Sequence, residues 1–319
     1  MNRADAVALH FQKAAELTVA KKNYQEHLTE LFLWMVKADA VTDDITSKTL
    51  SLMGESTTQI VSKQGGMIAG IEELAELLTK HTKLTFSSLI NDGERVAKET
   101  LIAEVIGENT EILAYERTIL NILGRMSGIA TATAELVAFI HDVPNTPAVA
   151  AIRKTPMMML DKKAVAVGGG VTHRLNLSDS ILIKDNHLGM LQKELGLATS
   201  EQAAVEAVKR CMQSAENYFE IEVDTLPQAN AILHAFVSEN AKQKQPKIMT
   251  ILLDNFQLED AEKFVLSLKK LPVYESILIE ASGEIAADNI VAWAKTGVDV
   301  VSLGAITHSA KVFNFSMRY

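Results

Sequence analysis

Beyond Pro147, short apolar runs alternate with stretches of helical periodicity, and this alternation limits the fold more than any other feature of the sequence. The six apolar runs are Ala148 to Ile152, Ser180 to Ile183, Tyr218 to Val223, Ile248 to Leu253, Ser276 to Glu280 and Val298 to Leu303. The helical stretches between most of them are Asp161 to Val167, Glu201 to Ala215, Leu226 to Val237, Leu258 to Lys270 and Ile285 to Thr296. Strands joined by crossover helices pair in parallel. The second half is therefore predicted to be a barrel or an open doubly wound sheet.

The first half has a mixed texture. Apolar residues recur at helical spacing in four stretches: Ala4 to Ala20, Asn23 to Ala38, Ile71 to Thr79 and Glu111 to Ile140. Three shorter stretches are typical of strands: Thr57 to Ser62, Lys83 to Ser88 and Glu99 to Gly107. Helical and strand periodicities in turn predict an α/β unit here. With 319 residues, the chain is long enough for about two domains.

The composition excludes several classes of protein. A formal net charge of −9 and an aromatic content of 5% argue against nucleic-acid binding. The single cysteine, Cys211, excludes an intrachain disulfide framework and a zinc site built from several cysteines. Charged residues interrupt the first 20 positions, and no window approaches about 18 uncharged apolar residues, so neither a signal peptide nor a membrane span is expected. We expect a cytoplasmic protein.

Cations gather in one span of this acidic chain, from Ile152 to Leu188. It contains Arg153, Lys154, Lys162, Lys163, His173, Arg174, Lys184 and His187, with a run of three glycines, Gly168 to Gly170, in its middle. Cations around glycines favour an anion pocket. The alternative, that individual lysines are solvated surface, stays open for each of them.

Polar residues follow the predicted strands where each strand ends. They are Arg153-Lys154, Lys184 to His187, Glu222, Asp254-Asn255, Ser282-Gly283 and Gly304. The carboxyl ends of parallel strands form the active-site face of α/β barrels. We expect the cations there to bind carboxylates or phosphates, and Glu222 and Asp254 to suit Mg²⁺. Ser282-Gly283, ahead of a helix predicted from Ile285, would be a phosphate seat.

Two histidines in this span are candidate acid–base groups, although a lone histidine is more often structural. His173, which stands beside Arg174 and follows the glycines, is the stronger candidate, and His187 is the weaker.

Taken together, these motifs resemble the quinolinate phosphoribosyltransferases, also called carboxylating nicotinate-nucleotide pyrophosphorylases. The matching segments, in family order, are Asp44 to Ser47, Ile68 to Gly70, Glu116 to Thr118, Ser127 to Thr131, Arg153 to Thr155, Gly168 to Arg174, Leu182 to His187, Glu220 to Asp224, Leu253 to Asn255, Glu280 to Gly283, Thr296 to Asp299 and Gly304 to Ser309. The resemblance covers the chain from about Asp39 onward.

The resemblance implies a fold and a reaction. It implies an N-terminal α/β sandwich over residues 1–120, completed by 310–319, and an incomplete parallel α/β barrel over 121–309. Family members use Mg²⁺ to transfer the phosphoribosyl group of phosphoribosyl pyrophosphate to quinolinate, and release CO₂ and pyrophosphate. The product is nicotinate mononucleotide, in NAD biosynthesis.

The resemblance also implies roles for individual residues. The family's quinolinate-binding residues fall on Arg153, His173, Arg174 and, from a partner subunit, Arg117. Lys154 and Lys184 match lysines between the two substrates, and Glu222 and Asp254 match acids near the ribose and Mg²⁺. Ser282, Gly283 and Gly304 match the phosphate-holding backbone. A homodimer, or a larger even-numbered assembly, is therefore implied, with neither nucleic acid nor membrane as a partner.

Two departures from the family pattern bear on the ring acid. The segment Pro156 to Met159 is about two residues shorter and lacks a glycine and an arginine, and Glu284 replaces a glycine. The departures leave open a paralogue of the molybdenum-transport-associated type that acts on another ring acid. Two further alternatives do not depend on them: a barrel lyase that uses Lys184 as a Schiff-base nucleophile, and a non-catalytic protein that binds anions in the same pocket.

Overall fold

A computed structural model describes residues 2–319, and the chain forms two compact units. We call them the parallel-sheet unit (up to residue 12, 136–152 and 173–303) and the antiparallel-sheet unit (13–135, 153–172 and 304–319). This division differs from one at residues 120 and 310, because the chain passes between the units several times.

The parallel-sheet unit is built on six strands in the order β6-β11-β10-β9-β8-β7. Their bounds are β6 Ala148–Ala151, β7 Ile181–Ile183, β8 Tyr218–Val223, β9 Ile248–Asp254, β10 Ile277–Ser282 and β11 Val300–Leu303. Every neighbouring pair is parallel. Within residues 2–319, β6 and β7 are the two edges of this sheet, so the sheet is open, as in an incomplete barrel.

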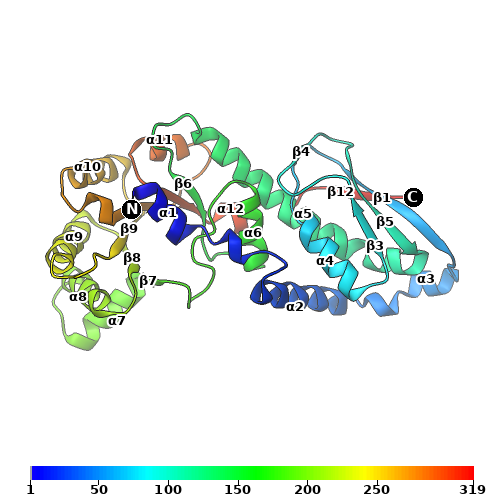
Figure 1. The fold of residues 1–319 in the computed structure, drawn as a ribbon, viewed down its shortest axis with the longest axis horizontal. Coiled ribbons are helices and arrows are strands. Elements are labelled where there is room, and N and C mark those ends of the chain that lie inside the picture. Colours follow the sequence, from blue (N-terminus) through cyan, green and yellow to red (C-terminus); the bar gives the residue numbers. More distant parts are fainter. Residues whose placement is uncertain (1) are drawn as a thin grey trace. The chain divides into compact units, whose positions relative to one another are not determined.

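Helices connect these strands along the outside of the sheet (Figure 1). They are α7 Asp185–Leu195, α8 Ser200–Gln213, α9 Leu226–Asn240, α10 Leu258–Leu268 and α11 Ile290–Lys295. The prediction missed α7. The predicted start of the last helix at Ile285 is wrong, because the Asn289 side chain accepts a hydrogen bond from the Ala286 amide and holds the preceding residues in turns.

The antiparallel-sheet unit contains a four-stranded sheet in the order β12-β1-β5-β3. The strands are β1 Glu55–Ser62, β3 Thr85–Ser88, β5 Leu101–Glu108 and β12 Phe315–Arg318, and a small second sheet pairs β2 Gly66–Met67 with β4 Arg95–Val96. The last strand of the chain, β12, pairs antiparallel with β1. Its helices are α2 Lys22–Ala38, α3 Ile45–Leu50, α4 Ile71–His81, α6 Met159–Val167, α12 Ala305–His308 and most of α5 Asn109–Ile140.

Helix α5 is long enough and apolar enough to cross a membrane, but 61% of its most apolar 18-residue window is buried in the protein. Such burial is typical of the core helix of a globular protein, and α5 owes its apolar character to this packing.

The N-terminal helix is shorter than its periodicity predicts. A single helix from Ala4 to Ala20 is wrong: α1 covers Arg3–Phe11, and a 3-10 turn follows at Ala14–Glu16. Gln12 has an extended backbone, φ −102° and ψ 104°, and ends the helix.

Candidate active site

Four parallel strands bring chemically useful side chains to the same edge of their sheet. Lys184 follows β7, Glu222 is the last residue but one of β8, Asp254 ends β9, and Ser282 ends β10. In the register of the sheet, Ser282 is paired with Asp254. With the adjoining Gly283, we call these five residues the carboxyl-end rim.

A direct polar contact in the rim joins Lys184 to Glu222. The lysine Nζ lies 2.7 Å from Oε2 of the carboxylate. The side chains are 44% and 13% exposed, so the pair remains open to water and to a ligand. A cation and an anion held at this edge can stabilise opposite charges that develop in a substrate.

The rest of the rim depends on close backbone packing. Asn255 donates from its side chain to Asp254 Oδ2 at 2.8 Å and from its amide to the Ser282 carbonyl at 2.9 Å. Gly283 has a φ of +95°, and a Cβ there would lie 2.1 Å from the Asn255 side-chain oxygen, so only glycine fits. Because α11 begins at Ile290, no helix begins directly after Gly283, and the prediction of a helix N-terminus at this point is wrong.

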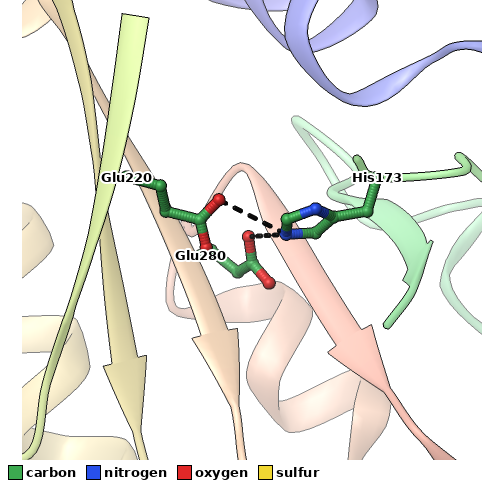
Figure 2. Close-up of side chains that lie close together, drawn as sticks. All are labelled: His173, Glu220 and Glu280. Atoms are coloured by element: carbon green, nitrogen blue, oxygen red, sulfur yellow. Dashed lines mark ion pairs between the residues drawn. The ribbon is translucent and has the colours of Figure 1, made fainter. Parts of the chain in front are cut away.

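Deeper in the same sheet lies a buried cluster of one histidine and two carboxylates. Nε2 of His173 lies 3.3 Å from Glu220 Oε2, on β8, and 3.3 Å from Glu280 Oε2, on β10. Figure 2 shows both carboxylates directed at the same ring nitrogen. Both glutamates are fully buried, and His173 is 5% exposed. We call these three residues the buried His–Glu cluster.

The cluster holds a proton at neutral pH. Burial alone would lower the pKa of His173, but the charges of Glu220 and Glu280 outweigh it and raise the pKa to about 10. Burial, followed by the charge of Glu280, raises the pKa of Glu220. The Arg174 backbone nitrogen lies 2.7 Å from His173 Nδ1, and Nε2 is the ring nitrogen that faces the two carboxylates.

Within residues 2–319, this cluster is the one group of at least three His, Cys, Asp or Glu residues whose potential ligand atoms come close enough for a metal ion. Glu222 and Asp254, the residues expected to hold Mg²⁺, are not part of it. A pair of carboxylates still fits Mg²⁺, which keeps several waters and binds through one or two carboxylates and substrate phosphates.

Arg174 and His187 border a separate cavity beside the edge strand β7. The cavity has a volume of about 420 Å³ and is also lined by Leu182 and Cys211. The Arg174 guanidinium donates to the Ser180 carbonyl at 3.2 Å, which fixes the direction of its side chain. His187 Nδ1 accepts the Lys184 amide hydrogen bond at 3.0 Å, so this histidine has the structural role of capping α7. A second arginine, Arg210, also lines this cavity.

The antiparallel-sheet unit contains the remaining predicted site residues. Arg153 and Lys154 follow β6 in the chain and are exposed, and Thr307 donates to the Lys154 carbonyl at 2.8 Å. Gly304 directly precedes α12. Arg117 lies on α5 with 65% of its side chain exposed, in a cavity of about 400 Å³ that Trp34 also lines.

Sequence reasoning did not select the group that holds the segment after Lys154. Fully buried Asp161 receives two hydrogen bonds from Arg125, at 2.9 and 2.8 Å, and accepts from Thr155 at 2.5 Å. The sequence-based prediction also did not select Glu220 and Glu280 as members of the buried His–Glu cluster. The available signal was a carboxylate inside each apolar run, YFEIEV and ILIEAS.

An open parallel sheet whose carboxyl ends present lysine, carboxylates and glycine defines the class of the protein: an α/β-barrel enzyme that acts on anionic substrates. The model of the quinolinate phosphoribosyl transferase N-terminal domain matches residues 44–127, and that of the C-terminal domain matches residues 129–318. The chain belongs to the quinolinate phosphoribosyltransferase family.

Individual relatives agree with this assignment. The chain is 34% identical over 267 residues to a "probable nicotinate-nucleotide pyrophosphorylase (carboxylating)" of Archaeoglobus fulgidus, covering 81% of this chain and 92% of that one. A relative of the same name from Bacillus subtilis is 34% identical over 286 residues, covering 88% and 89%. The solved nicotinate-nucleotide pyrophosphorylase of Francisella tularensis superposes with a TM-score of 0.75 at 30% identity, covering 92% and 96%.

Proposed function

We propose that the protein transfers the phosphoribosyl group of phosphoribosyl pyrophosphate to quinolinate and forms nicotinate mononucleotide, CO₂ and pyrophosphate, as a step of NAD biosynthesis. The observation that carries the proposal is the Lys184–Glu222 pair at the carboxyl-end rim of a chain whose two halves both match this family.

The chemistry follows from the charges. The ring nitrogen of quinolinate has a free lone pair, so it needs no base. It bonds to C1 of the ribose as the bond from C1 to pyrophosphate breaks, and the carboxylate next to the nitrogen then leaves as CO₂ while a proton takes its place. Glu222 faces the developing positive charge on the ribose, and Lys184 and Lys154 face the departing anion.

The two ring carboxylates of quinolinate need cations. Arg153, Arg174 and Arg117 offer planar donors that suit carboxylates in two-pronged contacts. Arg117, which is mostly exposed, would serve the active site of a second subunit in a homodimer or a larger even-numbered assembly. Ser282, Gly283 and Gly304 would hold phosphate through backbone amides, and His173 would contact the ring acid.

Glu222 and Asp254 would hold Mg²⁺, which would neutralise the charge of the pyrophosphate. Glu222 Oε2 accepts from Lys184 and Asp254 Oδ2 accepts from Asn255, so both carboxylates are held at the carboxyl ends of their strands. We further propose that the enzyme works in the cytoplasm.

The Schiff-base alternative fits the rim less well. A Schiff-base mechanism gives no role to the carboxylate 2.7 Å from Lys184 Nζ, whereas phosphoribosyl transfer uses both members of the pair. A changed ring acid is favoured by one local feature, the shortened segment in which Met158 has a φ of +48°. A screen of pyridine mono- and dicarboxylates addresses that alternative.

The direct experiment incubates purified protein with Mg²⁺, phosphoribosyl pyrophosphate and each pyridine acid, and measures nucleotide and CO₂ by chromatography and ¹⁴C release. We expect quinolinate to give nicotinate mononucleotide, and omission of Mg²⁺ to stop turnover. Release of nucleotide from another ring acid alone would assign the paralogue function, and binding of phosphoribosyl pyrophosphate without any product would identify a non-catalytic protein.

The shared site has its own test. Arg117→Ala and Lys184→Ala homodimers are expected to be inactive, but mixing and reassociating them would restore part of the activity, because one site of each mixed dimer then has both residues. Glu104→Gln, on β5, mixed with Lys184→Ala is the control for dilution. Confirmed mixed dimers without recovery would rule out a contribution from Arg117 of the partner subunit.

A further inference from the structure

Helix α1 lies outside the ranges that define the family domains, which begin at residue 44. It nevertheless belongs to the parallel-sheet unit, together with the buried His–Glu cluster and the rim. The first turn of α1 contacts residues at the start of two strands, and its last turn contacts His173.

The first turn of α1 is anchored where two central strands begin. The Arg3 guanidinium binds both carboxylate oxygens of Asp299, with Nε 3.0 Å from Oδ1, and also donates to the carbonyls of Tyr274 and Ile277. Ile277 is the first residue of β10, and Asp299 directly precedes β11. The Arg3–Asp299 side chains are 13% and 11% exposed, so this anchor is largely withdrawn from water.

The last turn of α1 contacts the cluster from the side. The His10 ring stacks on Tyr218 with the centroids 4.0 Å apart and the planes 8° from parallel. The Tyr218 hydroxyl in turn lies 3.0 Å from Thr250 Oγ1 and 3.5 Å from Glu220 Oε2. His10 therefore supports the strand residue that contacts one of the two carboxylates facing His173.

Phe11 contacts His173 itself. Its fully buried ring meets the imidazole edge to face with centroids 5.0 Å apart, and its carbonyl accepts the His173 amide hydrogen bond at 2.8 Å. His173 has a φ of +53°, a left-handed backbone that costs a residue other than glycine about 1–3 kcal/mol and persists where the surroundings hold it. The hydrogen bond from the His173 amide to the Phe11 carbonyl is one contact that holds His173 in this conformation.

We propose that α1 is a positioning element for the ring-acid subsite, in which His10 and Phe11 fix His173 and, through the adjoining peptide, the direction of Arg174. This rests on the proposed function, because the ring acid is the ligand whose affinity α1 sets. The alternative is that α1 only stabilises the sheet, in which case the affinities for both substrates would be unaffected, or would weaken together.

The test compares His10→Ala with His10→Phe, which keeps a flat ring on Tyr218, and with His234→Ala, an exposed histidine of α9. Loss of a stacked ring pair corresponds to about a two- to ten-fold change. We expect His10→Ala to raise KM for quinolinate by that factor while KM for phosphoribosyl pyrophosphate stays within about two-fold. His10→Phe and His234→Ala should resemble the wild-type protein.

A second readout does not depend on turnover. The His173 amide is bound to the Phe11 carbonyl, so its hydrogen exchange, measured by mass spectrometry or NMR, should be faster in His10→Ala and unchanged in His10→Phe. Arg3→Gln, at the other end of α1, should give the same pattern in both readouts and serves where His10→Ala does not fold.

The outcomes are separable. Equal rises in both KM values, or an unchanged KM for quinolinate with unchanged exchange at His173, would overturn the positioning role. A wild-type protein without turnover of quinolinate would overturn the proposed function instead, and exchange at His173 would then decide whether α1 positions that residue.

Discussion

The buried His–Glu cluster and the carboxyl-end rim share a strand and differ in how they hold charge. Glu220 and Glu222 are two residues apart on β8, so their side chains leave the same face of the sheet. Glu220 is fully buried and shares His173 with Glu280. Glu222 lies in the carboxyl-end rim and pairs with the half-exposed Lys184. Deep in the protein a charged group needs a permanent partner, because no water can replace it. At the rim the partner can be exchanged for a substrate.

The largest effect is expected for His173→Asn, which removes the cation of the cluster. Two buried carboxylates would then share one site, and loss of one partner from a buried ion pair costs about 3–5 kcal/mol. Asparagine tolerates the left-handed backbone at this position, so the loss reports on charge. Denaturant unfolding at pH 7 measures it, and His234→Asn on the exposed side of α9 is the control.

The same variant has a pH signature. The pKa of His173 is raised in the folded protein to about 10. The folded state therefore keeps a proton that the unfolded chain releases near pH 6.5, and the stability it provides is lost as the pH rises towards 10. The difference in unfolding free energy between the wild type and His173→Asn should shrink from pH 7 to pH 10. A constant difference would mean that His173 holds no proton in the cluster.

At the rim, Lys184→Ala is expected to affect catalysis and leave folding nearly unchanged. An exposed ion pair contributes about 0–1 kcal/mol to stability, whereas a positioned charge at a reacting centre is worth about 10²–10³ in kcat. Steady-state kinetics should show that loss with an unfolding midpoint near the wild type. Lys193→Ala, further along α7, is the matched control. Full activity in Lys184→Ala would remove the rim from the mechanism.

Glu73 offers a buried carboxylate without a bound cation. Tyr24 donates to it at 2.8 Å, and burial, followed by the charge of Asp92, raises the pKa of Glu73 to about 7. The folded state thus keeps a proton that the unfolded chain loses near pH 4.5, so stability falls as the pH rises from 4.5 to 7. Glu73→Gln should gain about 2 to 3 kcal/mol relative to the wild type between pH 5 and pH 8. Equal pH profiles in chemical denaturation, with Glu26→Gln as an exposed control, would contradict this.

The rim was predictable because strand ends are visible in sequence. The predicted strand Tyr218 to Val223 has the bounds of β8, and parallel pairing alone brings residues such as Lys184 and Glu222 to one edge. The 2.7 Å contact between Lys184 and Glu222 goes beyond that prediction, because it depends on β7 lying beside β8 in the sheet.

The cluster was not predictable, because Glu220 and Glu222 look alike in sequence and differ only in the depth to which β8 carries them. The break after Phe11 was also missed, since apolar spacing continues through it while the His173 amide takes up the Phe11 carbonyl from a distant part of the chain. The departure at Glu284 was visible in the sequence, because the family pattern has glycine there. In the structure Glu284 has a φ of +49°, in the left-handed region that favours glycine.

Glu280→Gln should change the free energy of unfolding least, by under about 1 kcal/mol. It gives the sharpest test of the difference between the buried His–Glu cluster and the carboxyl-end rim. The cluster places two carboxyl groups against one histidine ring, and an amide of the same shape leaves one carboxyl group for that ring. The charge of Glu280 also raises the pKa of Glu220, so that pKa should fall in the variant. Unfolding free energies and the infrared band of the Glu220 carboxyl measure the two effects. A loss of unfolding free energy above about 2 kcal/mol would show that both buried carboxyl groups are needed to hold His173. The buried cluster, like the rim, would then need each of its charged side chains.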